Sequence, residues 1–192
     1  MSGQHGNFSS SFSLSLYWRH SVAVAAIAES IARHLRRYDP IEPDEVFSAA
    51  IMHDIGKLVM AGYEPAVFDS YIAESSAKNV PLWQIEKAPL SHAWLGRQIA
   101  EHWHYPKDIT GAIAEHHEPT NSGPFGKLIG VVHIADAMAH AVGFRMNRGE
   151  AMPAPNAAVL ASMPLPLERF KIIAEEVIRR EAEFDSLLGS FT

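Results

Sequence analysis

Residues 51–59 read Ile-Met-His-Asp-Ile-Gly-Lys-Leu-Val, an apolar stretch with His53, Asp54 and Lys57 inside it. The surrounding apolar residues predict that the stretch is buried. A buried carboxylate or imidazole needs a charged or hydrogen-bonding partner, because desolvating an unpaired charge is costly. A shared metal cation is one such partner, and a buried hydrogen-bonded pair is the alternative. The stretch therefore predicts a fold built around a polar site that can hold metal.

Further side chains of the kind that bind metals lie on other apolar segments of the chain. They are His20, His92, the pair His116-His117 and Asp136. The protein has 11 histidines in 192 residues, so composition alone does not identify a site. A lone histidine such as His20 is typically a hydrogen-bonded core residue, and its position upstream of the His-Asp pair is what favours a metal role. Since these residues are far apart in the sequence, a shared site requires several segments to converge.

Apolar residues recur three and four positions apart in nearly every segment between helix breakers, without sustained alternation. We predict an all-α protein, a compact multi-helix bundle with the metal site between its helices. The expected helices cover 14–37, 43–61, 65–78, 81–86, 90–104, 107–117, 125–144 and 167–188. Residues 145–166 hold four prolines and are expected to form the one long loop.

The chain length suits one domain, which we expect to span residues 14–192. Residues 1–13, rich in Ser and Gly, predict a disordered leader or a tag. They lack the features of a secretory signal, and no later run approaches the roughly 18 apolar residues of a membrane-spanning helix. We therefore expect a cytoplasmic protein that does not bind membranes. The amphipathic last helix, 167–188, either packs on the bundle or binds a partner.

The formal net charge of −6 argues against bulk nucleic-acid binding, which normally requires a basic patch or stripe. There is no cysteine, so disulfides and thiolate ligands are excluded. A metal must therefore be held by nitrogen and oxygen atoms, which suits iron, manganese, nickel, zinc or magnesium.

The adjacent pair His53-Asp54 can serve one cation or two. Neighbouring residues on a helix point about 100° apart, so the pair can flank one ion, or the two oxygens of Asp54 can bridge two ions. In the second case the ligands divide into one set of His20, His53, Asp54 and Asp136, and another of Asp54, His92 and His116 or His117. Two such ions polarise a phosphoryl oxygen and generate hydroxide at neutral pH. Asp54 and Lys57 are then the candidate catalytic residues, with Lys57 steadying a phosphate as a point charge.

The remaining histidines are expected to contribute less. His133 and His140 share the helical face of Asp136, so either can replace it as a ligand or support it by hydrogen bonding. We expect three others, His34, His102 and His104, to be structural or exposed, and His5 to be disordered.

Taken in order, several short blocks resemble the HDOD family of the HD superfamily, which is named after a His-Asp pair. The blocks are Trp18-Arg19-His20-Ser21, Met52-His53-Asp54-Ile55-Gly56-Lys57-Leu58-Val59, Glu86, Ser91-His92-Ala93-Trp94-Leu95-Gly96, Trp103-His104-Tyr105-Pro106 and His116-His117-Glu118-Pro119. They cover about residues 16–140. The resemblance implies ligands at His20, His53, Asp54, His92, His116, His117 and Asp136, none of which is lost here.

Related HD-GYP hydrolases of cyclic di-GMP share the histidine-pair block, but this chain departs from them at two places. The residues after His117 lack the Gly-Tyr-Pro sequence, and Leu16 stands where some of those enzymes place an extra acidic ligand. These departures argue against a third metal and against cyclic di-GMP as substrate. HDOD domains usually carry a further helical region before the Trp-Arg-His-Ser block, so we expect a fragment of a longer signalling protein or a shortened member.

Two functions remain open, together with a simpler alternative. The resemblance implies a signal transduction module that acts on a signalling partner or follows an N-terminal regulatory domain. The intact ligand set and Lys57 instead favour a metal-dependent phosphohydrolase acting on a nucleotide or another phosphoester. The simpler alternative is a helical domain whose histidines only hydrogen-bond to one another.

Overall fold

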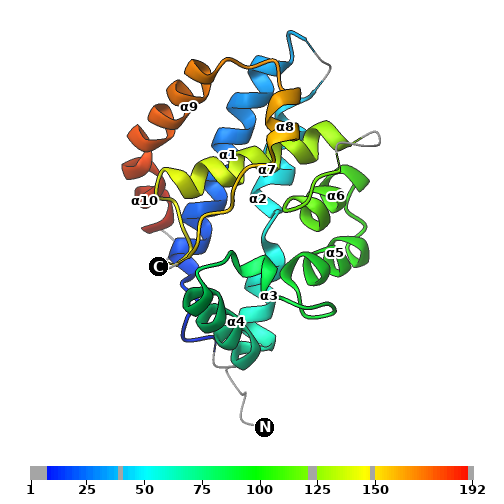
Figure 1. Ribbon diagram of the computed structural model, residues 1–192, viewed down its shortest axis with the longest axis vertical. Helices are drawn as coiled ribbons and strands as arrows, with labels where there is room; N and C mark the ends of the chain where they lie inside the picture. The colour runs from blue at the N-terminus through cyan, green and yellow to red at the C-terminus, as the bar shows by residue number, and fades with distance from the viewer. Residues whose placement is uncertain (1–7, 39–40, 121–124, 148–149, 190–192) are drawn as a thin grey trace.

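The computed structural model of the chain describes residues 8–38, 41–120, 125–147 and 150–189. In these ranges the regular structure is entirely helical, which confirms the all-α prediction. In Figure 1, α9 and α10 lie at the left of the bundle, α5 and α6 at the right, and α4 at the bottom. None of the helices in these ranges is long and apolar enough to cross a membrane.

The centre of the bundle is α1 (Leu14–Leu35), which packs against α2 (Pro43–Met52) and α7 (Gly126–Ala141). Its N-terminus is capped by the side chain of Ser13, which accepts a hydrogen bond from the backbone N–H of Leu16. Its middle is an Ala-, Val- and Ile-rich stretch, residues 23–28, which is buried throughout. Small side chains allow the neighbouring helices to approach closely, so the polar residues on α1 and α7 lie deep in the interior.

The helix predicted over 43–61 is in fact two, because the chain turns at His53-Asp54. The helix α2 ends at Met52, and α3 covers Ile55–Tyr63. Directly after the turn, α3 lies very close to another helix: a Cβ at Gly56 would lie 1.8 Å from the backbone oxygen of His92. Only glycine permits this approach of α3 to α5 (His92–His102). The prediction of one continuous helix was therefore wrong at the two residues that matter most for the site.

A smaller apolar cluster joins α3 to α4 (Pro65–Lys78) and the short 3-10 helix η1 (Leu82–Gln84). Residues 8–13 pack against it, because Ser9 N donates to Ala61 O at 2.9 Å and the Ser9 hydroxyl donates to Asp69. The leader predicted over 1–13 therefore remains a prediction for residues 1–7, which lie outside the described residues.

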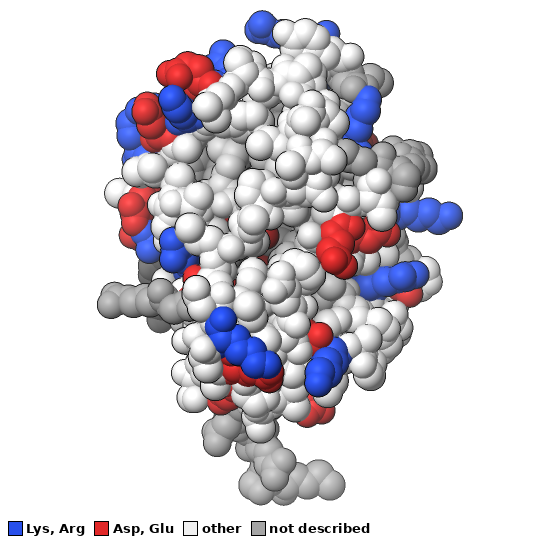
Figure 2. All heavy atoms as spheres, in the orientation of Figure 1, with Lys and Arg blue, Asp and Glu red and all other residues white. Residues whose placement is uncertain are grey.

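The C-terminal part differs from its prediction at two places. The proposed loop over 145–166 contains a short helix, α8 (Ala157–Ser162), which is capped by the side chain of Asn156. The predicted helix over 167–188 is divided at Arg180 into α9 (Leu167–Arg179) and α10 (Glu181–Gly189). The division lets α10 turn back so that the ring of Phe184 packs 6.0 Å from that of Phe144. Figure 2 shows charges of both signs intermixed along α9, so this side of the helix faces solvent.

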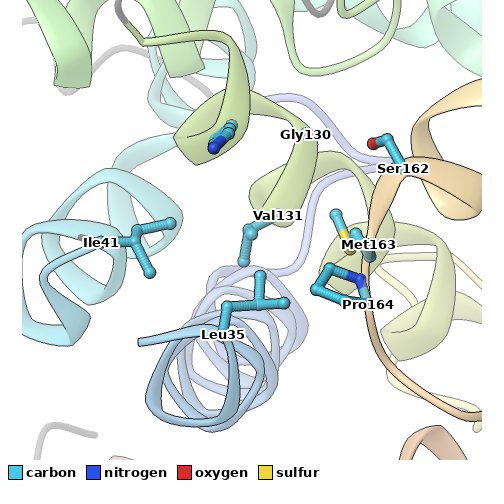
Figure 3. A pocket seen from close by; sticks show the side chains of 8 residues that line it. Leu35, Ile41, Gly130, Val131, Ser162, Met163 and Pro164 are labelled. Carbon is cyan, nitrogen blue, oxygen red and sulfur yellow. The ribbon is translucent and has the colours of Figure 1, made fainter. Parts of the chain in front are cut away.

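The remaining described helix, α6 (Lys107–Glu115), packs between α5 and α7. A small cavity of about 160 Å³ lies elsewhere, between the end of α1, α7 and the residues after α8. Figure 3 shows Leu35, Val131 and Met163 facing one another across it. Its lining contains none of the candidate metal ligands, so it is separate from the candidate site.

Candidate metal centre

The seven predicted ligands converge from five places in the chain on one buried point. They are His20 on α1, His53 and Asp54 in the α2–α3 turn, His92 at the start of α5, His116 and His117 after α6, and Asp136 on α7. All are buried except His117, which is half-buried. The structure therefore brings these seven residues together, as the sequence predicted.

Asp54 stands in the middle, with one carboxylate oxygen toward each group of histidines. Its Oδ2 lies 3.2 Å from His53 Nε2 and 3.6 Å from His20 Nε2. Its Oδ1 lies 3.3 Å from His92 Nε2 and 3.6 Å from His116 Nε2. A carboxylate placed in this way can bridge two cations, as expected from the adjacent His-Asp pair.

The candidate centre therefore has two halves that share Asp54. The inner half consists of His20, His53 and Asp136, with Asp136 Oδ1 3.3 Å from His20 Nε2. The outer half consists of His92, His116 and His117. In the outer half, the Nε2 atoms of His92 and His117 lie 2.9 Å apart.

Backbone carbonyls fix the tautomer of three of these imidazoles. The Nδ1 atoms of His20, His53 and His116 lie 2.8, 2.7 and 3.1 Å from the carbonyl oxygens of Phe144, Ala50 and Ala112. A carbonyl only accepts, so each Nδ1 carries the proton and donates it. In the neutral form of each ring, Nε2 is then left with a lone pair directed at the centre, the arrangement that metal-binding histidines use.

His92 is held by a carboxylate instead of a carbonyl. Glu86 Oε2 lies 2.5 Å from His92 Nδ1 and also accepts from the backbone N–H of His92 at 3.2 Å. A carboxylate behind a ligating imidazole orients the ring and increases its basicity. The sequence placed Glu86 in a family block but predicted no role for it.

Several atoms at the centre are buried without a hydrogen-bond partner among the described residues. They are Nε2 of His20, His53 and His116 and Oδ1 of Asp54 and Asp136. Leaving one such atom unsatisfied costs about 1–3 kcal/mol. Asp136 Oδ1 also faces His140 Nδ1 at 3.0 Å, and one or two cations would satisfy the remaining atoms together. Ligand atoms about 2.0–2.1 Å from an ion lie about 3.0–3.4 Å apart, close to the separations found here. The residues present fit a cation.

Electrostatics keep Asp54, His116 and His117 in the form that binds metal. His53 differs: burial lowers its pKa, but the charge of Asp54 outweighs burial and raises it. Burial raises the pKa of Asp54, but the charges of His53 and Lys57 outweigh burial and hold it well below its usual range. Burial lowers the pKa of His116 to about 4 and that of His117 well below its usual value. At neutral pH the aspartate is therefore ionised and these two imidazoles are neutral.

The side chain of Lys57 is buried, and its positive charge lies beside two carboxylates. Its Nζ lies 2.9 Å from Asp54 Oδ2 and 4.0 Å from Glu150 Oε1. Glu150 was missed in the sequence because it lies in the proline-rich segment predicted as a loop, where no periodicity marks a buried residue. Only 7% of its side chain is exposed.

The other described histidines fall into two groups, those that support the candidate centre and those that lie away from it. His140 Nδ1 lies 3.0 Å from Asp136 Oδ1; burial lowers the pKa of His140, but Asp136 and Glu150 outweigh burial and raise it to about 10. His133 uses both ring nitrogens, one with the carbonyl of His116 at 2.6 Å and one accepting from the backbone of Asn156 at 2.8 Å. It therefore supports the centre without facing it. Three more histidines lie apart, with His102 and His104 exposed and His34 half-buried, whereas His5 is outside the described residues.

Comparison with known proteins identifies the family. The HDOD domain profile matches residues 2–119, more than half of the chain. Asp136 and Glu150 lie beyond the matched segment. No match is found among curated proteins.

Solved structures share the fold at low sequence identity. A Marinobacter aquaeolei VT8 protein, named provisionally as a signal transduction protein, is 20% identical with a TM-score of 0.81 over 97% of this chain and 41% of its own. An HDOD domain protein of unknown function from Geobacter sulfurreducens is 22% identical, with a TM-score of 0.69 over 90% of this chain and 62% of its own.

A third structure is the HD domain of the L. monocytogenes phosphodiesterase PgpH in complex with cyclic-di-AMP. It is 18% identical, with a TM-score of 0.50 over 90% of this chain and 91% of its own. The present chain thus spans less than two thirds of the first two proteins. The ordered blocks, the profile match and the shared helical fold lead to one conclusion: this chain belongs to the HDOD domain family.

Proposed function

We propose that this chain is a metal-binding signal transduction domain whose centre holds two divalent cations bridged by Asp54. The observation that carries the proposal is the convergence on one point of five buried nitrogen and oxygen atoms that form no well-aligned hydrogen bond among the described residues. The inner ion has His20, His53, Asp54 and Asp136 as ligands, and the outer ion has Asp54, His92, His116 and His117. Iron, manganese, nickel, zinc and magnesium all suit these nitrogen and oxygen donors.

Binding of metal can act as a signal because the ligands come from helices far apart in the chain, so a bound ion would change how these helices are held together. The inner ion ties α1 and α7 to the α2–α3 turn, and the outer ion ties that turn to α5 and the end of α6. Binding to such a site is coupled to folding, since the ligands assemble only in the folded bundle. A partner protein or a further domain, contacting these helices from outside, would respond to that occupancy in the cytoplasm.

A role in signalling is favoured over turnover by the surroundings of Lys57. Its ammonium donates to Asp54 and lies near Glu150, so its positive charge is already balanced by two carboxylates. A phosphate that approached it would have to compete with both. The Marinobacter protein, provisionally a signal transduction protein, supports the same assignment through its fold.

A phosphohydrolase acting on a nucleotide or phosphodiester is the second candidate. It is favoured by the central position of Asp54 between two ligand sets and by a lysine at 2.9 Å from it. The fold shared with the PgpH phosphodiesterase domain, solved with cyclic-di-AMP, points the same way. When bound, two ions would supply a polarised phosphoryl oxygen and an activated water. Asp54 would hold the ions together, and Lys57 would offset charge on the phosphate.

Elemental analysis of the purified protein, combined with a phosphodiesterase assay, separates these functions. We expect two equivalents of metal per chain and no turnover of cyclic dinucleotides or a generic aryl phosphodiester with added Mn²⁺ or Fe²⁺. Turnover that disappears in a Lys57→Met variant would instead establish the hydrolase. Absence of metal from protein that was purified and then incubated with each ion would refute both functions.

A further inference from the structure

The candidate centre reaches the surface at one of its seven ligands. Six are buried, and His117 alone is half-buried. The ring of Trp83 stacks on His117, with the ring centroids 5.5 Å apart and the planes at 15°. This stacking holds the imidazole in one plane at the edge of the outer half.

A cavity of about 300 Å³ lies against this edge. Its polar and aromatic lining consists of Trp83, Glu86, Ser91, Glu115, His117 and Glu118. It therefore connects solvent to a candidate ligand without any rearrangement of the bundle. We call it the His117 cavity.

The charge of the His117 cavity is negative throughout. Three of its lining residues are glutamates and none is Lys or Arg. Glu115 and Glu118 are exposed, and neither forms an ion pair with a residue that the structure describes. Figure 2 shows acidic side chains over the region of α5 and α6, with Lys and Arg side chains beside them. Such a mouth concentrates cations and repels phosphate anions.

Glu86 connects this mouth to the interior. Its Oε2 is occupied by His92, but its Oε1 is buried and has no hydrogen-bond partner among the described residues. Only 1% of the Glu86 side chain is exposed. A buried carboxylate oxygen without a partner is costly, and a passing cation would satisfy it beside the ligand His92, which Glu86 contacts directly.

We propose that the His117 cavity is the uptake port through which divalent cations reach the centre. Glu115 and Glu118 attract the hydrated ion at the surface, Glu86 Oε1 receives it as water is shed, and His117 and His92 bind it. The proposal rests on the metal centre of the proposed function and adds a route to it. It also implies that an anionic phosphoester is disfavoured at the same mouth.

The test measures how fast the full chain takes up Ni²⁺ after its metal has been removed with a chelator. Ni²⁺ bound at His117 quenches the fluorescence of the stacked Trp83, so stopped-flow mixing follows the arrival of the ion; a Trp83→Phe variant identifies that signal. The test variant is Glu115→Gln/Glu118→Gln. The matched control is Glu45→Gln/Glu175→Gln, which changes the formal charge equally, from −6 to −4, on exposed parts of α2 and α9.

We expect the association rate of the test variant to fall roughly threefold to tenfold at low ionic strength, and the difference to shrink in high salt. The final Ni²⁺ content at saturation should equal that of the unsubstituted protein, because Glu115 and Glu118 are not ligands. An unchanged rate would overturn the port, and so would an equal loss in the control variant. If the unsubstituted protein took up no Ni²⁺, Mn²⁺ or Zn²⁺, the metal centre itself would fail, and the port with it.

Discussion

The inner and outer halves of the candidate centre share Asp54 but differ in their surroundings. Around the inner half, the protein supplies cations of its own, with Lys57 2.9 Å from Asp54 and His140 3.0 Å from Asp136. In the outer half, His116 and His117 are neutral because burial lowers the pKa of both, His117 is half-buried, and an acid-lined cavity lies beside it. The inner half can therefore keep its shape by internal ion pairing, whereas the outer half depends more on an external cation and exchanges it more easily.

Asp54→Ala is expected to have the largest effect because it removes the one residue that serves both halves. Both ions should be lost, and the buried ammonium of Lys57 would lose its close partner. Removing one member of a buried ion pair costs about 3–5 kcal/mol. Elemental analysis and urea unfolding measure the two effects. Full metal content in this variant would refute the bridging role.

Two single histidine variants separate the halves. His20→Ala should lose the inner ion and destabilise the fold, because it also removes the hydrogen bond to the carbonyl of Phe144 in the core. His117→Ala should lose the outer ion, with a smaller change in stability because the side chain is half-buried. Metal content of about one per chain is expected in each case. Loss of both ions from either variant would mean that the halves do not bind independently.

Glu150→Gln probes the internal charge balance of the inner half. Burial raises the pKa of Glu150, but His140 and Lys57 outweigh burial and lower it to about 2. A lowered folded pKa contributes stability above the unfolded value of about 4.5, and this stability is lost as the pH falls toward 2. The substitution should cost about 1–3 kcal/mol at pH 7, and less at pH 3. Equal destabilisation at both pH values would contradict this account.

His104→Gln is expected to change least. This exposed residue lies outside both halves, although it belongs to one of the family blocks. Metal content should be unchanged. The free energy of unfolding should stay within about 0.5 kcal/mol of that of the unsubstituted protein. A large loss of metal would show that the wrong histidines have been assigned to the centre.

The sequence predicted the convergence of the ligands better than the path of the chain between them. His20 and Asp136 sit in apolar helices, where a buried polar side chain needs a partner, and the resemblance to the HDOD blocks implied that this partner lies beside Asp54. The turn at His53-Asp54 could not be predicted in this way, because the apolar pattern continues through it, and the close contact of Gly56 with the backbone of His92 that follows the turn joins residues 36 positions apart.

Glu150 shows a second limit of sequence-based reasoning. Nothing in its neighbourhood has helical or strand periodicity, and its buried carboxylate lies near two cations on other segments, Lys57 at 4.0 Å and His140 at 3.6 Å. The break at Arg180 is similar, because it depends on where Phe184 finds space beside Phe144. Long-range contacts decide these features, and local pattern does not encode them.

The most direct test of the two-ion centre is anomalous diffraction from crystals of the metal-loaded protein, recorded at the absorption edge of the metal found by elemental analysis. The account predicts two peaks per chain on opposite sides of the Asp54 carboxylate, one beside His20 and one beside His117. A single peak, or peaks that do not contact Asp54, would contradict it.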